Sequence, residues 1–193
     1  MVDDERRLLE RLTRRDEAAF NELVRRHQAQ VYRLLLRMLG DAAEAEDVAQ
    51  EVFVSVFKSI EGFRGDSALS TWLYRIAANH AKNRIKYLAR RARDAEQPLD
   101  EFAETRAAAA FTARPDGPDQ LVESHQAGGH LQSAYASLES EQRLLLSLRD
   151  MDNLSYEEIR QITGLPIGTV KSKLHRARMA LHERFLALQR GTP

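Results

Sequence analysis

The sequence of 193 residues contains no cysteine, which excludes disulfide bonds and thiolate metal sites. It also lacks an apolar run as long as a membrane span, and its first residues, Met-Val-Asp-Asp-Glu-Arg-Arg, do not form the apolar core of a secretory signal. We therefore expect a soluble protein that acts in the cytoplasm and does not insert into a membrane.

Features of an enzyme are equally scarce. The six histidines are scattered along the chain, without the close spacing that is typical of metal ligands. Neither a glycine-rich phosphate loop nor a nucleophile elbow is present. These absences predict a protein that is not an enzyme, with no catalytic residues, no bound metal and no cofactor.

The formal net charge of zero hides an uneven distribution of charge. Residues 1–93 and 142–193 each carry four more basic than acidic side chains, whereas residues 94–141 carry eight more acidic than basic ones. Binding to nucleic acid depends on where the charge lies rather than on the total. The distribution favours two basic domains separated by an acidic segment, and it is compatible with a nucleic-acid partner.

The strongest local signal is a tight turn followed by a basic helix, over residues 164–178. Gly164 and Pro166 separate this helix from the one before, which begins with the capping-box spacing of Ser155 and Glu158. The pattern predicts a helix-turn-helix. Because helix pairs joined by a glycine turn also occur in purely structural bundles, the charge of the second helix decides between the two interpretations.

The second helix has an apolar stripe on one side, and no acidic residue occurs between Glu158 and Glu183. An ordinary exposed face would mix carboxylates with the cations. At 100° per residue, the side opposite the stripe carries Ser172, His175 and Arg176, with Lys171 and Lys173 at its borders and Arg178 towards the rear. A DNA-reading helix needs polar groups that contact base edges, surrounded by cations that hold the phosphates. This face offers both.

The first half of the chain also has helical periodicity. Apolar residues recur at helical spacing over residues 16–39, and a second helix is expected over residues 44–61, ending at Gly62. Its apolar face includes Phe57, and the opposite face presents Asp47, Gln50, Glu51 and Val54. Val54 is either an isolated exposed valine, which is common in soluble proteins, or part of a docking site for a basic partner helix.

A turn at residues 63–68 precedes a helix that is expected to begin near Ser70. From Arg75 to Arg93 there are seven basic residues and no acidic one. Trp72 is expected on the same helix face as Arg75, Asn79, Lys82, Asn83 and Lys86. A tryptophan among cations and amides suits stacking on unpaired bases; in the alternative interpretation, Trp72 caps the core and the cations are only solvated.

Residues 94–130 combine an acidic excess with stretches rich in alanine, proline and glycine, including Gly128-Gly129. They are expected to form either a mobile tether that runs into a broken helix or an acidic strand that occupies a basic channel in a partner. The fold class is therefore predicted as all-α. Two small helical domains, residues 1–93 and 131–193, are joined by a flexible acidic linker, and the second domain contains the helix-turn-helix.

Four motifs occur in series along the chain. They are Ala45-Glu-Asp-Val-Ala-Gln-Glu-Val-Phe53, Phe63-Arg-Gly-Asp-Ser67, Thr71-Trp-Leu-Tyr-Arg-Ile-Ala-Ala-Asn79, and Leu154-Ser-Tyr-Glu-Glu-Ile159 followed by residues 168–178. Their order and separation resemble those of extracytoplasmic-function sigma factors, a branch of the sigma-70 family, over almost the whole chain. Each motif is weak alone, and the series makes the resemblance specific.

The resemblance implies a subunit that binds core RNA polymerase and directs it to promoters, while catalysis belongs to the polymerase. The minus-thirty-five element would be recognised as a duplex by Thr169, Lys171, Ser172, Lys173, His175, Arg176 and Arg178. The melted non-template strand of the minus-ten element would contact Arg64, Gly65, Asp66, Ser67, Trp72, Arg75, Asn79, Lys82, Asn83 and Lys86. The polymerase would contact Asp47, Gln50, Glu51 and Val54, and an anti-sigma factor would control the protein.

Two positions stand out within this resemblance. Arg160 lies where such proteins usually have a small residue that lets the two helices pack closely, so it is expected either to point outward or to widen the helix crossing. His175 lies at a variable position, which leaves its contact with DNA open.

Two other functions also stay open. One is a stand-alone helix-turn-helix activator, and the other is a sigma-mimicking protein that binds polymerase or an anti-sigma factor without opening promoters. The sequence likewise leaves open whether the two domains pack on each other in the free protein.

Overall fold

The computed structural model describes residues 2–94 and 128–191, and within these ranges the secondary structure is helical, with no β-strand. In chain order the helices are α1 (Val2–Thr13), α2 (Glu17–Leu39), α3 (Ala42–Ser59), the short 3₁₀ helix η1 (Ile60–Gly62), α4 (Leu69–Asp94), α7 (Ser140–Leu146), the π-helical turn η3 (Ser147–Met151), α8 (Tyr156–Thr163) and α9 (Ile167–Arg190). A further helical stretch covers residues 128–136. The all-α prediction is confirmed.

Helices α2 and α3 begin close to the predicted residues because aspartates cap them. Asp16 accepts a hydrogen bond from the Ala19 backbone amide at 3.1 Å, and Asp41 accepts one from the Glu44 amide at 3.1 Å. Such caps satisfy amides that the first helical turn leaves unpaired. The apolar stripes of α2 and α3 pack with α4 into a core that contains Leu23, Val31, Leu34, Leu35, Val48, Val52, Val56, Leu73 and Ala77.

Phe57, expected in the buried face of α3, is instead 39% exposed. Its ring lies edge-on to Phe20 of α2, with ring centroids 5.1 Å apart and an angle of 76° between the planes. The Arg15 guanidinium lies over the ring of Phe57, 5.5 Å from its centroid. Phe57 therefore closes the edge of the α2–α3 pair and does not enter the core.

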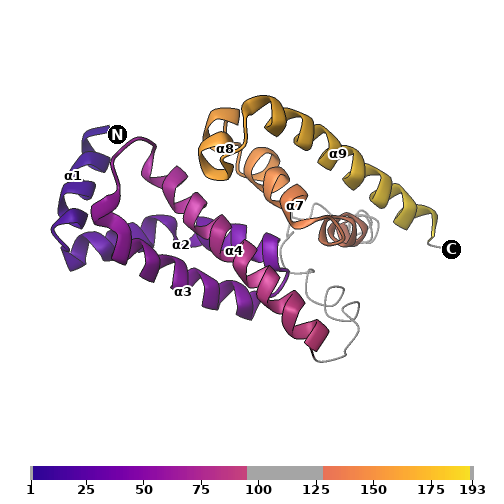
Figure 1. Cartoon of the computed structure of the whole chain (residues 1–193), viewed down its shortest axis with the longest axis horizontal. Helices are drawn as coiled ribbons and strands as arrows, with labels where there is room; N and C mark the ends of the chain where they lie inside the picture. Colours follow the sequence, from indigo (N-terminus) through magenta and orange to yellow (C-terminus); the bar gives the residue numbers. More distant parts are fainter. Residues whose placement is uncertain (1, 95–127, 192–193) are drawn as a thin grey trace, which may run out of the picture.

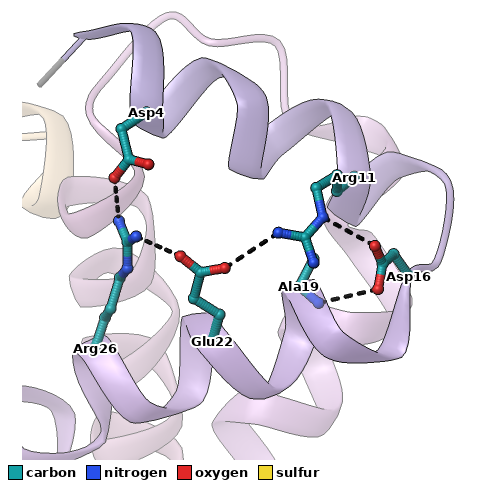
Figure 2. A network of polar contacts seen from close by, with 6 residues as sticks. All are labelled: Asp4, Arg11, Asp16, Ala19, Glu22 and Arg26. Carbon is teal, nitrogen blue, oxygen red and sulfur yellow. Dashed lines mark hydrogen bonds and ion pairs between the residues drawn. The ribbon is translucent and has the colours of Figure 1, made fainter.

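Helix α1 has no counterpart among the helices predicted from the sequence. Figure 2 shows the polar contacts between α1 and α2: Asp4 accepts a hydrogen bond from Arg26 at 2.8 Å, and Glu22 accepts from both Arg26 and Arg11. Exposed ion pairs of this kind are largely screened by solvent, so we expect most of the attachment to come from the burial of apolar side chains. The side chains of α1 that enter the core are Leu8 and Leu12.

The second part of the chain has its own buried stripe, and in Figure 1 helices α7, α8 and α9 lie along one side of α4. Its buried residues include Leu144, Leu145, Leu148, Ile159, Ile162, Val170, Leu174 and Ala177. Beyond Ala177 the stripe of α9 continues with Leu181 and Phe185, which are only half-buried. Gly128 and Gly129 are the first described residues of the helical stretch 128–136, so the helix break expected at this pair stays a prediction.

The two parts pack against each other, α4 against α8 and α2 against α7. The predicted linker, residues 94–130, falls mostly on residues 95–127, which lie outside the described residues. None of the helices that the structure describes is long and apolar enough to cross a membrane.

Candidate DNA and polymerase interfaces

The helix-turn-helix lies at the predicted residues. The Glu158 amide donates to the Ser155 hydroxyl at 3.2 Å, and the Ser155 amide donates to the Glu158 carboxylate at 2.8 Å, which completes the capping box of α8. Gly164 ends α8 with φ 74°, a left-handed conformation that favours glycine. Pro166 then precedes the first residue of α9. Gly164 and Pro166 therefore end α8 and fix the start of α9.

The centre of the outward face of α9 is polar and exposed, as predicted. Ser172, His175 and Arg176 are all exposed, and the hydrogen bonds of the Ser172 and Arg176 side chains stay within the helix. The Ser172 hydroxyl donates to the Thr169 carbonyl at 3.1 Å, and Arg176 Nε donates to the Ser172 carbonyl at 3.4 Å. Exposed Lys171 borders the face, with its Nζ atom 5.4 Å from the Tyr156 ring centroid. These side chains form the reading face of α9.

Two cations predicted for DNA contact are instead engaged by carboxylates of neighbouring elements. Lys173 forms an ion pair with Glu141 of α7. Arg178 donates two hydrogen bonds to Asp150 of η3, at 3.0 and 2.5 Å, and these bonds raise the pKa of the guanidinium. The two cations therefore hold α9 against α7 and η3, and the structure does not group them with the reading face.

A cavity of about 420 Å³ opens at the start of α4. It brings together five of the residues predicted for the minus-ten strand: Arg64, Asp66, Ser67, Trp72 and Arg75. The turn that carries Arg64 and Asp66 passes through Gly65 with φ 74°, so this position favours a residue without a Cβ atom. Arg160 and Gln161 of α8 complete the lining from the other part of the chain.

The expectation that Trp72 shares the exposed face of α4 is wrong. Trp72 is only 8% exposed, because its ring packs against Phe63 with ring centroids 5.1 Å apart. The residue lies in the first turn of α4, next to the turn that leads into the helix. Trp72 is thus a wall of the cavity rather than an open stacking platform.

The basic face of α4 continues away from the cavity. Arg75, Asn79, Asn83 and Lys86 are exposed, and Lys82 is half-buried. Burial on the other sides of the helix matches the predicted stripe at Leu73, Ala77 and Ala81, and it extends to Tyr74 and Ala78. The exposed face forms a polar and basic track that leads from the cavity along α4.

Two residues of this site escape prediction from the sequence. The Glu5 carboxylate of α1 accepts a hydrogen bond from the Leu69 amide at 2.8 Å, so α1 caps the start of α4 beside the cavity. The Thr71 hydroxyl is buried and lines the cavity, and it has no hydrogen-bond partner within the described part of the chain. Spacing along the sequence cannot reveal that Glu5 caps a helix that begins at Leu69. Thr71, in contrast, is adjacent to Trp72 in the sequence, and this position could have marked it as a candidate site residue.

The acidic face of α3 lies elsewhere on the first part of the chain. Asp47, Gln50, Glu51 and Val54 line a hollow of about 520 Å³, together with Ser55, His80 and Arg84. Val54 is 51% exposed. Arg84 of α4 donates to Glu51 at 2.6 Å and to Glu44 at 2.8 Å, so the hollow has a fixed basic side. The four predicted residues do share one exposed face, and their contact with a polymerase stays a prediction.

No group of histidine, aspartate or glutamate side chains in residues 2–94 and 128–191 is arranged to hold a metal ion.

Comparisons with known proteins match both parts of the chain. Residues 23–93 match the family model "Sigma-70 region 2", and residues 130–181 match "Sigma-70, region 4". The chain is 36% identical over 190 residues to the RNA polymerase sigma-H factor of Pseudomonas aeruginosa, covering 97% of both proteins. It is 37% identical over 183 residues to the ECF RNA polymerase sigma-E factor of Escherichia coli K12, covering 95% of both.

Solved structures share the fold. The sigma factor RpoE of Bartonella quintana, in complex with the anti-sigma factor NepR, aligns with a TM-score of 0.68 and 22% identity over 90% of this chain and 98% of that one. CnrH, in complex with the cytosolic domain of CnrY, aligns with a TM-score of 0.64 and 20% identity over 95% of this chain and 97% of that one. With its two family regions and near full-length relatives, the chain belongs to the extracytoplasmic-function sigma factors of the sigma-70 family.

Proposed function

We propose that this chain is the promoter-specificity subunit of a bacterial RNA polymerase. It binds the core enzyme through α3, captures the minus-ten element at the start of α4 and reads the minus-thirty-five element with α9. The observation that carries the proposal is the presence on one chain of two separate features suited to DNA, the cavity beside Trp72 and the reading face of α9. A stand-alone activator needs only the second of them.

At the upstream element, α9 enters the major groove, which is about 12 Å wide and admits a helix. Arg176 is the side chain suited to a bidentate contact with guanine, with Ser172 and His175 beside it. Lys171 reaches the phosphates at the border of the face. Lys173 and Arg178 support this arrangement indirectly, because their ion pairs fix α9 on α7 and η3.

At the downstream element, one base of the non-template strand leaves the duplex and enters the cavity. Trp72 and Phe63 supply its aromatic wall, and the unpaired hydroxyl of Thr71 gains a hydrogen-bond partner. Extrusion of a base costs a few kcal/mol, and stacking on an aromatic side chain contributes about 1–3 kcal/mol. Capture therefore offsets much of the cost of opening, without nucleotide hydrolysis.

The strand beyond the captured base follows the exposed face of α4. Arg75 and Lys86 attract its phosphates, while Asn79 and Asn83 offer hydrogen bonds to the splayed bases. The helix carries no carboxylate from Arg75 to Arg93. The phosphates of the strand therefore meet no negatively charged side chain of this segment.

The α3 face docks on the clamp helices of the largest polymerase subunit, as the family resemblance implies. Asp47 and Glu51 suit a basic partner helix, and Val54 supplies an apolar contact at the centre of the patch. The chain performs no catalysis itself and acts in the cytoplasm with its polymerase. Because the structurally similar sigma factor RpoE of Bartonella quintana is in complex with the anti-sigma factor NepR, we include control by an anti-sigma factor in the proposal.

Retention of genomic fragments tests this function. Core RNA polymerase from the host is mixed with fragmented genomic DNA, with and without the chain, and heparin-resistant complexes are collected and sequenced. A discrete set of fragments retained only when both proteins are present supports the proposal. Binding to core without retained fragments favours the sigma-mimicking protein, and binding to specific fragments without core favours the stand-alone activator.

A further inference from the structure

The acidic face of α3 is supported by side chains of the neighbouring helix α4. Arg84 Nη1 donates to the Glu44 carboxylate at 2.8 Å, and Arg84 Nη2 donates to the Glu51 carboxylate at 2.6 Å. The Arg84 side chain is only 20% exposed, whereas the Glu51 side chain is 50% exposed. The guanidinium therefore lies deeper than the carboxylate that it holds, and Glu51 stays open to a partner.

A second side chain of α4 contacts the other oxygen of Glu51. His80 Nδ1 lies 3.4 Å from Glu51 Oε2, while Arg84 binds Oε1. His80 is held in turn by Ser55 of α3, whose hydroxyl oxygen lies 2.9 Å from His80 Nε2. Both oxygens of the Glu51 carboxylate thus have a partner on α4. Because each carboxylate oxygen can accept more than one hydrogen bond, Glu51 can still receive a donor from outside.

Charge repulsion along α3 gives this support a physical reason. Glu44, Asp47 and Glu51 follow one another at spacings of three and four residues, so their carboxylates are neighbours on one helix face and repel each other. Arg84 bridges the two outer carboxylates. Without this bridge, the Glu51 side chain would turn away from Asp47 and sample several rotamers, and a partner would have to order it on binding.

We propose that Arg84 and His80 are positioning residues for polymerase binding, which fix the Glu51 carboxylate in the geometry that receives a cationic side chain of the polymerase. This inference rests on the proposed function, in which the acidic face of α3 docks on a basic helix. Both residues come from α4, the helix whose exposed face carries the DNA track. The same helix therefore serves the promoter on one side and the polymerase contact on another.

The charge of Arg84 has an effect of its own, which opposes the positioning. A cation near a face that docks on a basic partner slows association by repulsion, and this effect depends on salt. Fixed geometry acts instead on the dissociation rate. Arg84→Lys separates the two effects, because it keeps the charge but loses the planar fork that reaches two carboxylates.

Binding kinetics test the proposal. Core polymerase is passed over the immobilised full chain at several salt concentrations, and both rate constants are measured by surface plasmon resonance. Arg84→Lys should raise the dissociation rate about 2- to 10-fold, while the association rate and its salt dependence stay unchanged. In a Glu51→Gln background the same exchange should have no further effect, because Arg84 acts through this carboxylate.

His80→Ala is the second variant, and it decides the question if Arg84→Lys does not fold. It should also raise the dissociation rate, since it removes the other contact of Glu51 with α4. Arg11→Lys is the matched control, because Arg11 likewise bridges two carboxylates, Asp16 and Glu22, but between α1 and α2 (Figure 2). It should leave both rate constants unchanged.

Asp47→Asn separates the failure of this inference from that of the proposed function, because Asp47 lies on the same acidic face. An unchanged affinity in Asp47→Asn, or no binding of the unmodified chain to core, refutes the proposed docking and the positioning role with it. Weaker binding of Asp47→Asn together with an unchanged dissociation rate in folded Arg84→Lys or His80→Ala overturns the positioning role alone. An effect of Arg84→Lys that persists in the Glu51→Gln background overturns it as well.

Discussion

Replacing Arg176 with alanine should weaken promoter binding far more than the same change at Arg178, although the two residues lie on the same helix. Arg176 is exposed, and its contact within the chain is the 3.4 Å hydrogen bond from Nε to the Ser172 carbonyl. Arg178 is held by two hydrogen bonds to Asp150 at 3.0 and 2.5 Å. The first guanidinium is available to DNA, whereas the second would have to leave its carboxylate.

The expected magnitudes differ accordingly. A bidentate contact between arginine and guanine contributes about 1–3 kcal/mol, so Arg176→Ala should lower the affinity of the holoenzyme roughly 5- to 150-fold. Arg178→Ala removes a surface ion pair, which contributes about 0–1 kcal/mol to folding, and it should change the affinity for DNA only through the position of α9.

The assay compares holoenzyme binding to a promoter fragment and to the same fragment with a scrambled upstream element, over a range of salt concentrations. If Arg176 reads a base, its loss matters only on the intact element and the salt dependence is unchanged. If it contacts a phosphate, binding weakens on both fragments and the slope of log affinity against log salt falls by about 1. Equal losses for Arg176→Ala and Arg178→Ala would refute the reasoning.

Four further changes test other parts of the site. Glu5→Ala should reduce the free energy of unfolding in urea by about 0.5–2 kcal/mol, since it removes the cap of α4 at Leu69. The control Glu10→Ala, which breaks only the exposed pair with Arg6, should change this free energy by less than about 0.5 kcal/mol. Similar losses in the two variants would contradict the cap. Trp72→Phe keeps an aromatic ring against Phe63 but shortens the cavity wall, so promoter opening measured by permanganate reactivity should slow more than initial binding; an equal loss in both steps would count against the assigned role. Gly164→Ala should lower the free energy of unfolding by about 1–2 kcal/mol, because its φ of +74° is unfavourable for a residue with a Cβ atom. Gly168→Ala, in a helix with open space at the Cβ position, should raise the free energy of unfolding by about 0.5–1 kcal/mol. Changes of the same sign in thermal unfolding of the two variants would be inconsistent with this account. Val54→Arg should weaken core binding by roughly tenfold or more at an unchanged melting temperature, because it introduces a positive charge into an acidic face that is proposed to dock on a basic partner helix. Unchanged affinity would remove α3 from the interface.

The sequence carries enough information to place most helices, because their ends depend on local chemistry. Asp16 and Asp41 cap α2 and α3, and Ser155, Glu158 and Gly164 define α8. Each of these signals acts over three or four residues, so spacing alone reveals it. The exposed positions of Val54 and Arg176 likewise follow from the periodicity of a single helix.

The errors occur where a residue from elsewhere in the chain decides the outcome. A helical wheel shows that α9 has no carboxylate before Glu183, but it cannot show that Glu141 and Asp150 come from α7 and η3 to engage Lys173 and Arg178. The burial of Trp72 depends on Phe63 in the preceding turn. The wheel of α4 likewise misses the contact of this helix with α8.

Helix α1 escapes prediction for a related reason. Only two of its side chains, Leu8 and Leu12, are fully buried among those described, which is a weak periodic signal in a short and strongly charged segment. Its contribution to the site, the cap from Glu5 to Leu69, becomes visible only when the helices are assembled. Long-range caps and ion pairs therefore set the limit of what the sequence alone predicts here.

Run-off transcription tests the central claim most directly. Purified core polymerase from the host is incubated with fragmented genomic DNA and nucleotides, with and without this chain, and the transcripts are sequenced from their 5′ ends. The account predicts discrete new transcripts that start a fixed distance downstream of a shared two-part sequence. Demonstrable binding to core polymerase with no new transcripts would contradict it.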